Sequence, residues 1–138
     1  MKQKEIYIAG PMSGHPNLNY AAFFAAEKKY RADGWKVWNP ASKDEQGMIA
    51  LMPGFATGND KEILAHGWDF REAYLWDIEK VIKSDAIYML KGWQKSSGAI
   101  GEHATAVAIK QRYPDYEIIY EDEKEMDFYP RLRNTILY

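Results

Sequence analysis

The chain has 138 residues, a length that fits one domain with its own core. Hydrophobic residues make up 46% and charged residues 28%, a balance typical of soluble globular proteins and too apolar for a disordered chain. The net charge of −2 lacks the positive excess of proteins that bind long nucleic acids, and the absence of cysteine excludes disulfides, thiolate zinc sites and cysteine nucleophiles. No segment reads as a signal peptide or a membrane span, so we expect a cytoplasmic protein.

The first third of the chain predicts a strand, a helix and a second strand. Residues 4–9 form a β-prone run that ends in a Gly-Pro turn. Residues 19–32 are rich in helix formers, and Gly34 ends the pattern. Residues 35–38 alternate in polarity and stop before Asn-Pro. Together these segments predict a βαβ unit.

The second half repeats the alternation. Residues 71–83 predict a helix, 85–90 a buried strand, 99–111 a helix and 117–120 a strand. Strands that alternate with helices favour a parallel sheet covered on both faces. We therefore expect an α/β fold, a Rossmann-like three-layer sandwich around a central parallel sheet of four to five strands.

We expect residues 1–138 to form a single domain in which 41–70, rich in Gly and Pro, is a lid or an insertion. Ligands of such sheets bind at the carboxyl ends of the strands. The loops at that edge are 10–18, 39–70 and 91–98.

A Ser- and Gly-rich turn, Ser96-Ser97-Gly98, precedes the predicted helix 99–111. Free N–H groups and the dipole at a helix start favour a phosphate or a carboxylate, and the serine hydroxyls add donors. The alternative interpretation is ordinary helix capping.

Glu102 falls in the first turn of that predicted helix, where the dipole keeps a carboxylate ionised and suited to act as a nucleophile. A capping box would explain the glutamate without chemistry. That motif needs Ser or Thr three residues earlier, where this chain has Ala99.

Asp77 interrupts an apolar stripe that includes Tyr74 and Val81 at helical spacing. Partial burial favours the protonated carboxyl, which would suit Asp77 to donate a proton. A salt bridge to Arg71 or Lys80 is the alternative.

The first turn holds Gly10, Ser13 and Gly14, which let a ligand approach the sheet but match neither a Walker loop nor a GxGxxG fingerprint. Trp93 and Trp68 are candidates to stack on a base, although packing in the core is the commoner use of tryptophan.

The three histidines, His15, His66 and His103, lack metal-ligand spacing. We expect surface or structural roles for them and no metal site.

The segments IYIAGPMSG, VWNP and YLWDIEKVIKSDAIYMLKGWQKSSGAIGEHATA, in this order, resemble a domain family common in phages and bacteria. That family is similar to nucleoside 2-deoxyribosyltransferases and 2′-deoxynucleoside 5′-phosphate N-hydrolases. The resemblance covers about two thirds of the chain and omits much of 41–70 and the tail.

The resemblance implies roles for individual residues. Glu102 would attack the anomeric carbon, Asp77 would transfer a proton to the base, and Tyr7 would orient the nucleophile. Ser96 stands where the hydrolases have a phosphate-binding Ser and the transferases an Asp. The loop GPMSG departs from the Arg- and Gly-rich loop of the hydrolases.

We therefore expect an N-glycosidase that cleaves or exchanges the base of a (deoxy)nucleoside 5′-monophosphate, without a cofactor. The alternative is a non-catalytic nucleotide-binding protein of the same fold, a sensor or a sequestering module. Such a binder has no need for two carboxylates near an anionic ligand. A phosphoribohydrolase of the cytokinin-activating type is a second rival, but its Gly-Gly-x-Gly-Thr signature is missing.

The expected partner is a small nucleotide, together with further copies of the chain in a homodimer or larger homo-oligomer. The tail 121–138 ends in an apolar and aromatic run that would pack on its own sheet or on a neighbouring subunit. The resemblance implies the host cytoplasm if a phage encodes the protein.

Overall fold

The computed structural model describes residues 2–43, 60–65 and 67–126. Strand β1 (Glu5–Ala9) opens the fold. It leads through the 3₁₀ turn η1 (Pro16–Asn19) into helix α1 (Tyr20–Ala32) and strand β2 (Lys36–Trp38).

The second half begins with a short helix, α3 (Asp60–Ala65), inside the segment expected to be a lid or an insertion. Helix α4 (Phe70–Lys83) and strand β3 (Ala86–Met89) follow. Helix α5 (Ser97–Arg112) and strand β4 (Glu117–Tyr120) complete the alternation. Between β3 and α5 lies the 3₁₀ turn η2 (Trp93–Lys95), and η3 (Glu123–Glu125) follows β4.

The four described strands form one parallel sheet in the order β2-β1-β3-β4. The register pairs Tyr7 with Trp38 on one side and with Ile87 on the other. All pairings are parallel, which confirms the expected α/β sandwich. The chain order reverses between β1 and β3, and α/β proteins bind ligands at this switch point.

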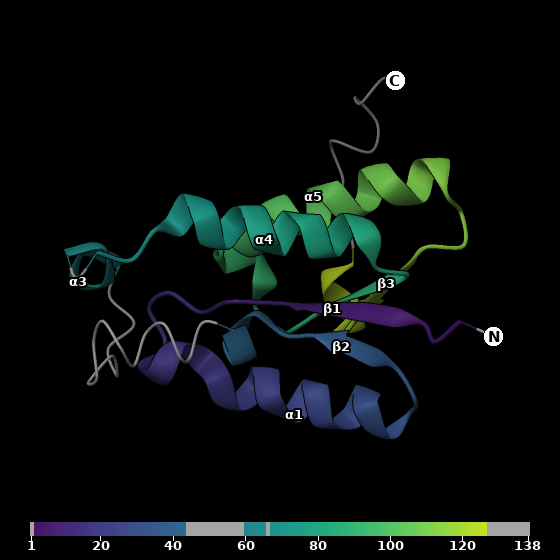
Figure 1. Ribbon diagram of the computed structural model, residues 1–138, viewed down its shortest axis with the longest axis horizontal. Helices are drawn as coiled ribbons and strands as arrows, with labels where there is room; N and C mark the ends of the chain where they lie inside the picture. Colours follow the sequence, from purple (N-terminus) through teal and green to yellow (C-terminus); the bar gives the residue numbers. More distant parts are fainter. Residues whose placement is uncertain (1, 44–59, 66, 127–138) are drawn as a thin grey trace.

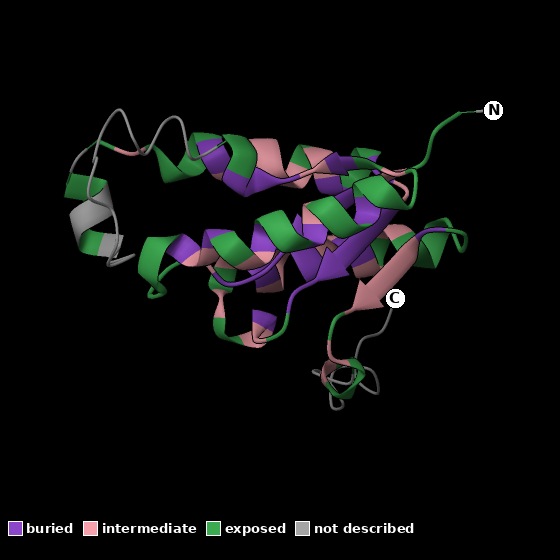
Figure 2. Cartoon of the chain, turned by 90° about the horizontal axis from the view of Figure 1, so that it is seen from below, coloured by how far each residue is buried: buried purple, intermediate pink, exposed green. Residues whose placement is uncertain are grey.

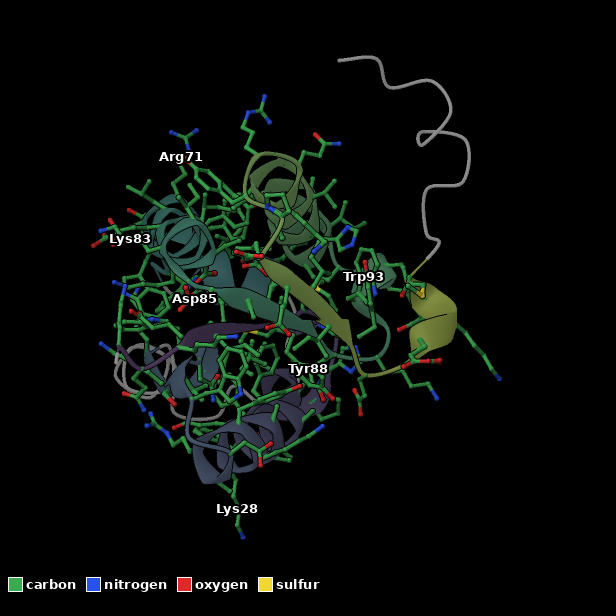
Figure 3. All side chains as sticks on the ribbon, turned by 90° about the vertical axis from the view of Figure 1, so that its right-hand side faces the viewer. Lys28, Arg71, Lys83, Asp85, Tyr88 and Trp93 are labelled. Atoms are coloured by element: carbon green, nitrogen blue, oxygen red, sulfur yellow. The ribbon has the colours of Figure 1, made fainter. Side chains whose placement is uncertain are left out.

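The sheet is covered on both faces (Figure 1): α1 lies on one side, and α4 and α5 lie on the other. In the end-on view of Figure 3, Lys28 on α1 and Arg71 on α4 point outward in opposite directions. Figure 2 shows buried central strands beneath helices with exposed outer faces, while the edge strand β4 has intermediate exposure.

Alternation along β1 divides the core in two. Ile6 and Ile8 pack toward α1 with Phe23, whereas Tyr7 and Ala9 face α4 and α5. All five residues are at most 1% exposed, because both faces of a parallel sheet are buried.

Helix α5 begins two residues earlier than the sequence predicted. Ser96 is its N-cap, and the Ser96 hydroxyl oxygen accepts a hydrogen bond of 3.2 Å from the Ala99 N–H. The prediction was wrong about Glu102, which lies in the second turn and beyond the strongest part of the helix dipole.

Candidate active site

A pocket of about 520 Å³ opens at the carboxyl ends of β1 and β3. Tyr7 and Gly10 line it from the end of β1, and Ser96 and Glu102 line it from the start of α5. The pocket therefore lies at the switch point of the sheet, where the fold places ligand sites.

The inner end of the pocket holds a buried hydrogen bond between Tyr7 and Glu102. The Tyr7 hydroxyl donates to Glu102 Oε2 over 2.8 Å. Tyr7 is fully buried and Glu102 is 5% exposed. A carboxylate is rarely buried without such a partner, so β1 fixes the orientation of the Glu102 side chain on α5.

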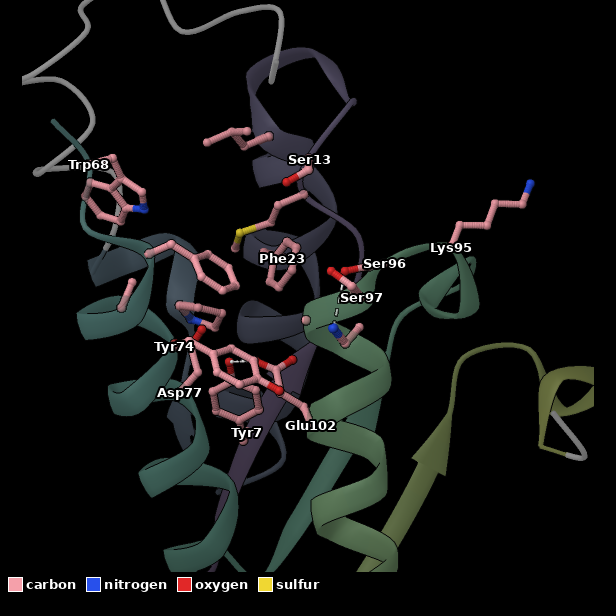
Figure 4. Close-up of a pocket in the computed structure, with 18 of the residues that line it drawn as sticks. Tyr7, Ser13, Phe23, Trp68, Tyr74, Asp77, Lys95, Ser96, Ser97 and Glu102 are labelled. Carbon is pink, nitrogen blue, oxygen red and sulfur yellow. Dashed lines mark hydrogen bonds between the residues drawn. The ribbon is translucent and has the colours of Figure 1, made fainter. Parts of the chain in front are cut away.

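Asp77 lines the same pocket from α4. Figure 4 shows Asp77 and Tyr74 on α4 close to Tyr7 and Glu102 at the inner end of the pocket. Asp77 Oδ1 is shielded from solvent. Lys80, the expected alternative partner of Asp77, forms an ion pair of 3.3 Å with Glu79.

The start of α5 supplies polar groups nearer the mouth. Ser96, Ser97 and Gly98 all line the pocket. Capping of Ala99 by Ser96 confirms the capping interpretation for this serine, but its O–H remains a donor. The first N–H groups of a helix have no acceptor within it, so those of Ser97 and Gly98 suit an anionic ligand.

The first loop contributes Ser13, which is exposed and lines the pocket. Lys95 is the one basic side chain among the described lining residues, and Figure 4 shows it directed away from the pocket.

The remaining wall is apolar and aromatic. The rings of Phe70 and Tyr74 stack with centroids 5.5 Å apart and an interplanar angle of 13°. Phe70 is 53% exposed at the rim. The other apolar lining residues are Met12, Leu18, Phe23, Pro40, Leu64, Trp68 and Ala73.

The helical pattern predicted Tyr74 as part of an apolar stripe, and it did not identify Tyr74 or Phe70 as pocket residues. Their spacing of four residues was the available signal, because it places two rings on one helical face.

The structure does not place Trp93 or Gly14 among the residues that line the pocket. Trp93 is fully buried, with its ring centroid 4.2 Å from that of His103. Gly14 has a φ of 82° and shapes the turn after β1, but it does not line the pocket.

Gly10 does line the pocket, although its missing side chain serves the packing of the sheet. A Cβ at this position would lie 2.6 Å from Leu90 Cβ, so the chain after β1 passes close to the end of β3. Only glycine permits this approach without displacing Leu90.

His103, next to Glu102, points into a separate buried cluster. Its Nε2 lies 2.7 Å from the Tyr120 hydroxyl, and burial lowers the pKa of His103 to about 4. This is the expected structural role, and His15 is exposed as expected.

Parts of three predictions lie outside the described residues: His66, most of the expected lid 41–70, and the apolar end of the tail, 127–138. Within the described part of the chain, no group of His, Asp or Glu side chains could hold a metal ion. None of the helices described there is long and apolar enough to cross a membrane.

In a comparison with known protein families, residues 4–113 match the family described as "Domain of unknown function (DUF4406)". This range contains every element from β1 to α5 and all the pocket residues. No curated protein and no solved structure matches the chain.

Proposed function

The chain belongs to the DUF4406 family, and we propose that its pocket is the active site of an N-glycosidase acting on a (deoxy)nucleoside 5′-monophosphate. The observation that carries the proposal is the buried Tyr7–Glu102 hydrogen bond at the carboxyl ends of the strands, with Asp77 in the same pocket. The resemblance to nucleoside 2-deoxyribosyltransferases and 2′-deoxynucleoside 5′-phosphate N-hydrolases supports the same roles for these residues.

In the first step a Glu102 carboxylate oxygen forms a bond to C1′ of the sugar while the bond from C1′ to the base nitrogen breaks. Asp77 gives its proton to the leaving base. The product is a glycosyl ester of Glu102, the intermediate of retaining glycosidases. Tyr7 holds the carboxylate in position for this attack.

In the second step a water oxygen bonds to C1′, Asp77 takes one proton from the water, and the Glu102 carboxylate leaves. The net reaction is hydrolysis. When a free base attacks in place of water and gives its proton to Asp77, the net reaction is exchange of bases.

The 5′-phosphate lies at the start of α5 in this proposal. Ser96 precedes Glu102 by six residues, which corresponds to about 9 Å along a helix. This length leaves room for a sugar 5-phosphate between the helix start and the nucleophile. The Ser97 and Gly98 N–H groups and the two serine hydroxyls would bind the phosphate oxygens.

The base would occupy the apolar end of the pocket. Phe23, Trp68 and Phe70 line the pocket and offer flat surfaces for a ring. An apolar wall suits a base that must leave as a neutral molecule once Asp77 has protonated it.

The protein acts, in this proposal, in the cytoplasm and as a homodimer or larger homo-oligomer. Leu64 and Phe70 at the rim of the pocket are 54% and 53% exposed, which suits contact with a neighbouring subunit. Light scattering at micromolar concentration tests this part, and a monomer of about 16 kDa with full activity would contradict it.

A panel of nucleosides and their 5′-monophosphates tests the reaction. Each compound is incubated with the protein, and chromatography measures the free base. We expect base release from monophosphates in excess over the protein. Binding of a monophosphate without release from any compound would instead support the non-catalytic nucleotide-binding protein.

A further inference from the structure

Tyr74 lies among the pocket carboxylates but takes no part in the chemistry proposed above. It precedes Asp77 by three residues on α4, so the two side chains leave the helix on the same face. Its ring lines the pocket beside Glu102 (Figure 4), and its hydroxyl reaches the backbone of α5.

Two glycines on α5 make room for this ring. A Cβ at Gly101 would collide with the Tyr74 hydroxyl oxygen, whereas a Cβ at Gly98 would lie 3.8 Å from Tyr74 Cε1, an ordinary contact. Gly101 is therefore the residue that permits α4 and α5 to enclose the ring.

Figure 4 shows Asp77 and Glu102 near the ring of Tyr74. Burial raises the pKa of Tyr74, and the negative charges of Glu102 and Asp77 raise it further. Glu102 is 5% exposed and Asp77 Oδ1 is shielded from solvent, so these carboxyl oxygens have little contact with solvent.

Other titratable groups near the two carboxylates come from three elements. Tyr7 on β1 donates to Glu102, and Lys95 before α5 points away from the pocket. His103 on α5 lies against Tyr120, and burial keeps it neutral above about pH 4. Neither basic side chain is directed at the two carboxyl groups.

We propose that Tyr74 is a positioning residue: its ring, seated against Gly101, excludes water from the space around Asp77 and Glu102 and makes the two carboxyl groups titrate as one coupled pair. Two carboxylates near each other in a medium of low dielectric do not both ionise readily. The Tyr7 hydrogen bond favours the ionised form of Glu102, so the shared proton resides on Asp77.

The proposed glycosidase needs an ionised Glu102 and a protonated Asp77, which is the state described above. The role of this state in catalysis rests on the proposed function. The coupling itself is a property of the free protein. It can therefore be measured without a substrate and holds or fails whether or not the protein turns over nucleotides.

Carbon NMR of the side-chain carboxyl groups, followed against pH in the free protein, tests the proposal. Asp77→Asn and Glu102→Gln assign the two signals. We expect two apparent titration steps separated by about one pH unit or more. Tyr74→Ala should bring the steps together, and Tyr74→Phe, which keeps the ring, should leave the separation unchanged.

A matched pair of glycine variants tests the same point without changing Tyr74. Gly101→Ala should displace the ring and reduce the separation as Tyr74→Ala does, whereas Gly98→Ala should preserve it. Alanine has a higher helix propensity than glycine, so neither variant weakens α5 intrinsically. In a protein that already carries Tyr74→Ala, Gly101→Ala should cause no further change in the separation of the two titration steps.

Several results would overturn the proposal. One is that the two titration steps of the carboxyl groups are as far apart in Tyr74→Ala as in the parent protein. Another is a separation of the titration steps that Gly98→Ala and Gly101→Ala change by the same amount. If Tyr74→Ala does not fold, as judged by circular dichroism, Tyr74→Phe and the glycine pair decide the question. A coupled titration in a protein without glycosidase activity would reject the proposed function and leave the role of Tyr74 standing.

Discussion

At the scale of single residues, replacement of Ser96 by alanine would remove two interactions at once, the helix cap and the proposed contact with the phosphate. The Ser96 oxygen caps α5, and its O–H is placed to bind the proposed phosphate. Loss of the cap alone costs about 1 kcal/mol of stability. A substitution that keeps the cap and removes the donor separates the two interactions.

Ser96→Asp is that substitution, because aspartate caps a helix as well as serine does. It replaces a donor by a negative charge, so kcat/KM for monophosphates should fall at least about 10- to 150-fold, the effect of losing one charge-assisted hydrogen bond. The kcat/KM for the corresponding nucleosides, measured by steady-state kinetics, should change little. An equal loss on nucleosides and monophosphates would contradict the assignment of the phosphate to the start of α5.

Asp77 carries the proton transfer in the proposed reaction. Asp77→Asn cannot donate a proton, so the rate of base release should fall by about 10²- to 10⁴-fold. The loss should be smaller for substrates whose base leaves readily without protonation. A loss of equal size for good and poor leaving bases, measured by chromatography, would assign Asp77 a structural role instead.

At the scale of elements, the approach of β1 to β3 depends on Gly10. Gly10→Ala places a Cβ within 2.6 Å of Leu90 Cβ, and overpacking of this kind costs about 1 to 3 kcal/mol. Urea denaturation should show this fall in the free energy of unfolding. Gly98→Ala, which meets nothing closer than 3.8 Å and lies within α5, is the control and should be at least as stable as the parent. A Gly10→Ala protein as stable as the parent would show that Gly10 is not required for packing.

The alternation of strands and helices was predictable from the sequence because it follows from local patterns. The apolar runs of β1 and β3 are continuous, as strands buried on both faces must be, and they predicted a parallel sheet with covered faces. The start of α5 was missed by two residues because Ser97 and Gly98 are poor helix formers, and the cap from Ser96 compensates for them.

The candidate site was predictable only in part. Glu102 and Asp77 stand out as carboxylates on helices that otherwise contribute to the core, and the structure places both in one pocket. The place of Tyr74 in the pocket and the burial of Trp93 were not predictable, because a helix or turn pattern gives the spacing of aromatic residues but not the direction of each ring. That direction depends on tertiary contacts such as those of Trp93 with His103 and of Tyr74 with Gly101.

At the scale of the whole molecule, the buried His103 makes stability depend on pH. Burial lowers the pKa of His103 to about 4 from an ordinary value of 6.5. Between these values the unfolded chain binds a proton that the folded protein does not, so the free energy of unfolding falls as the pH drops from about 6.5 to 4.

Thermal unfolding at a series of pH values measures this effect. Tm should fall across the window in the parent protein, and the fall should be smaller in His103→Gln, which has no proton to gain. His15→Gln, at an exposed position, is the control and should behave as the parent does. A parent and a His103→Gln protein with the same pH dependence would show that His103 does not set it.

The proposed reaction depends on Glu102 as the nucleophile, so the decisive comparison is the rate of base release from a nucleoside 5′-monophosphate by the parent protein and by Glu102→Gln. Glutamine keeps the volume of the side chain and an oxygen that can accept from the Tyr7 hydroxyl, so the fold and the phosphate site should persist. We predict base release by the parent and none by Glu102→Gln, while calorimetry shows the same affinity of both proteins for the monophosphate. Base release by Glu102→Gln at the rate of the parent would contradict the account.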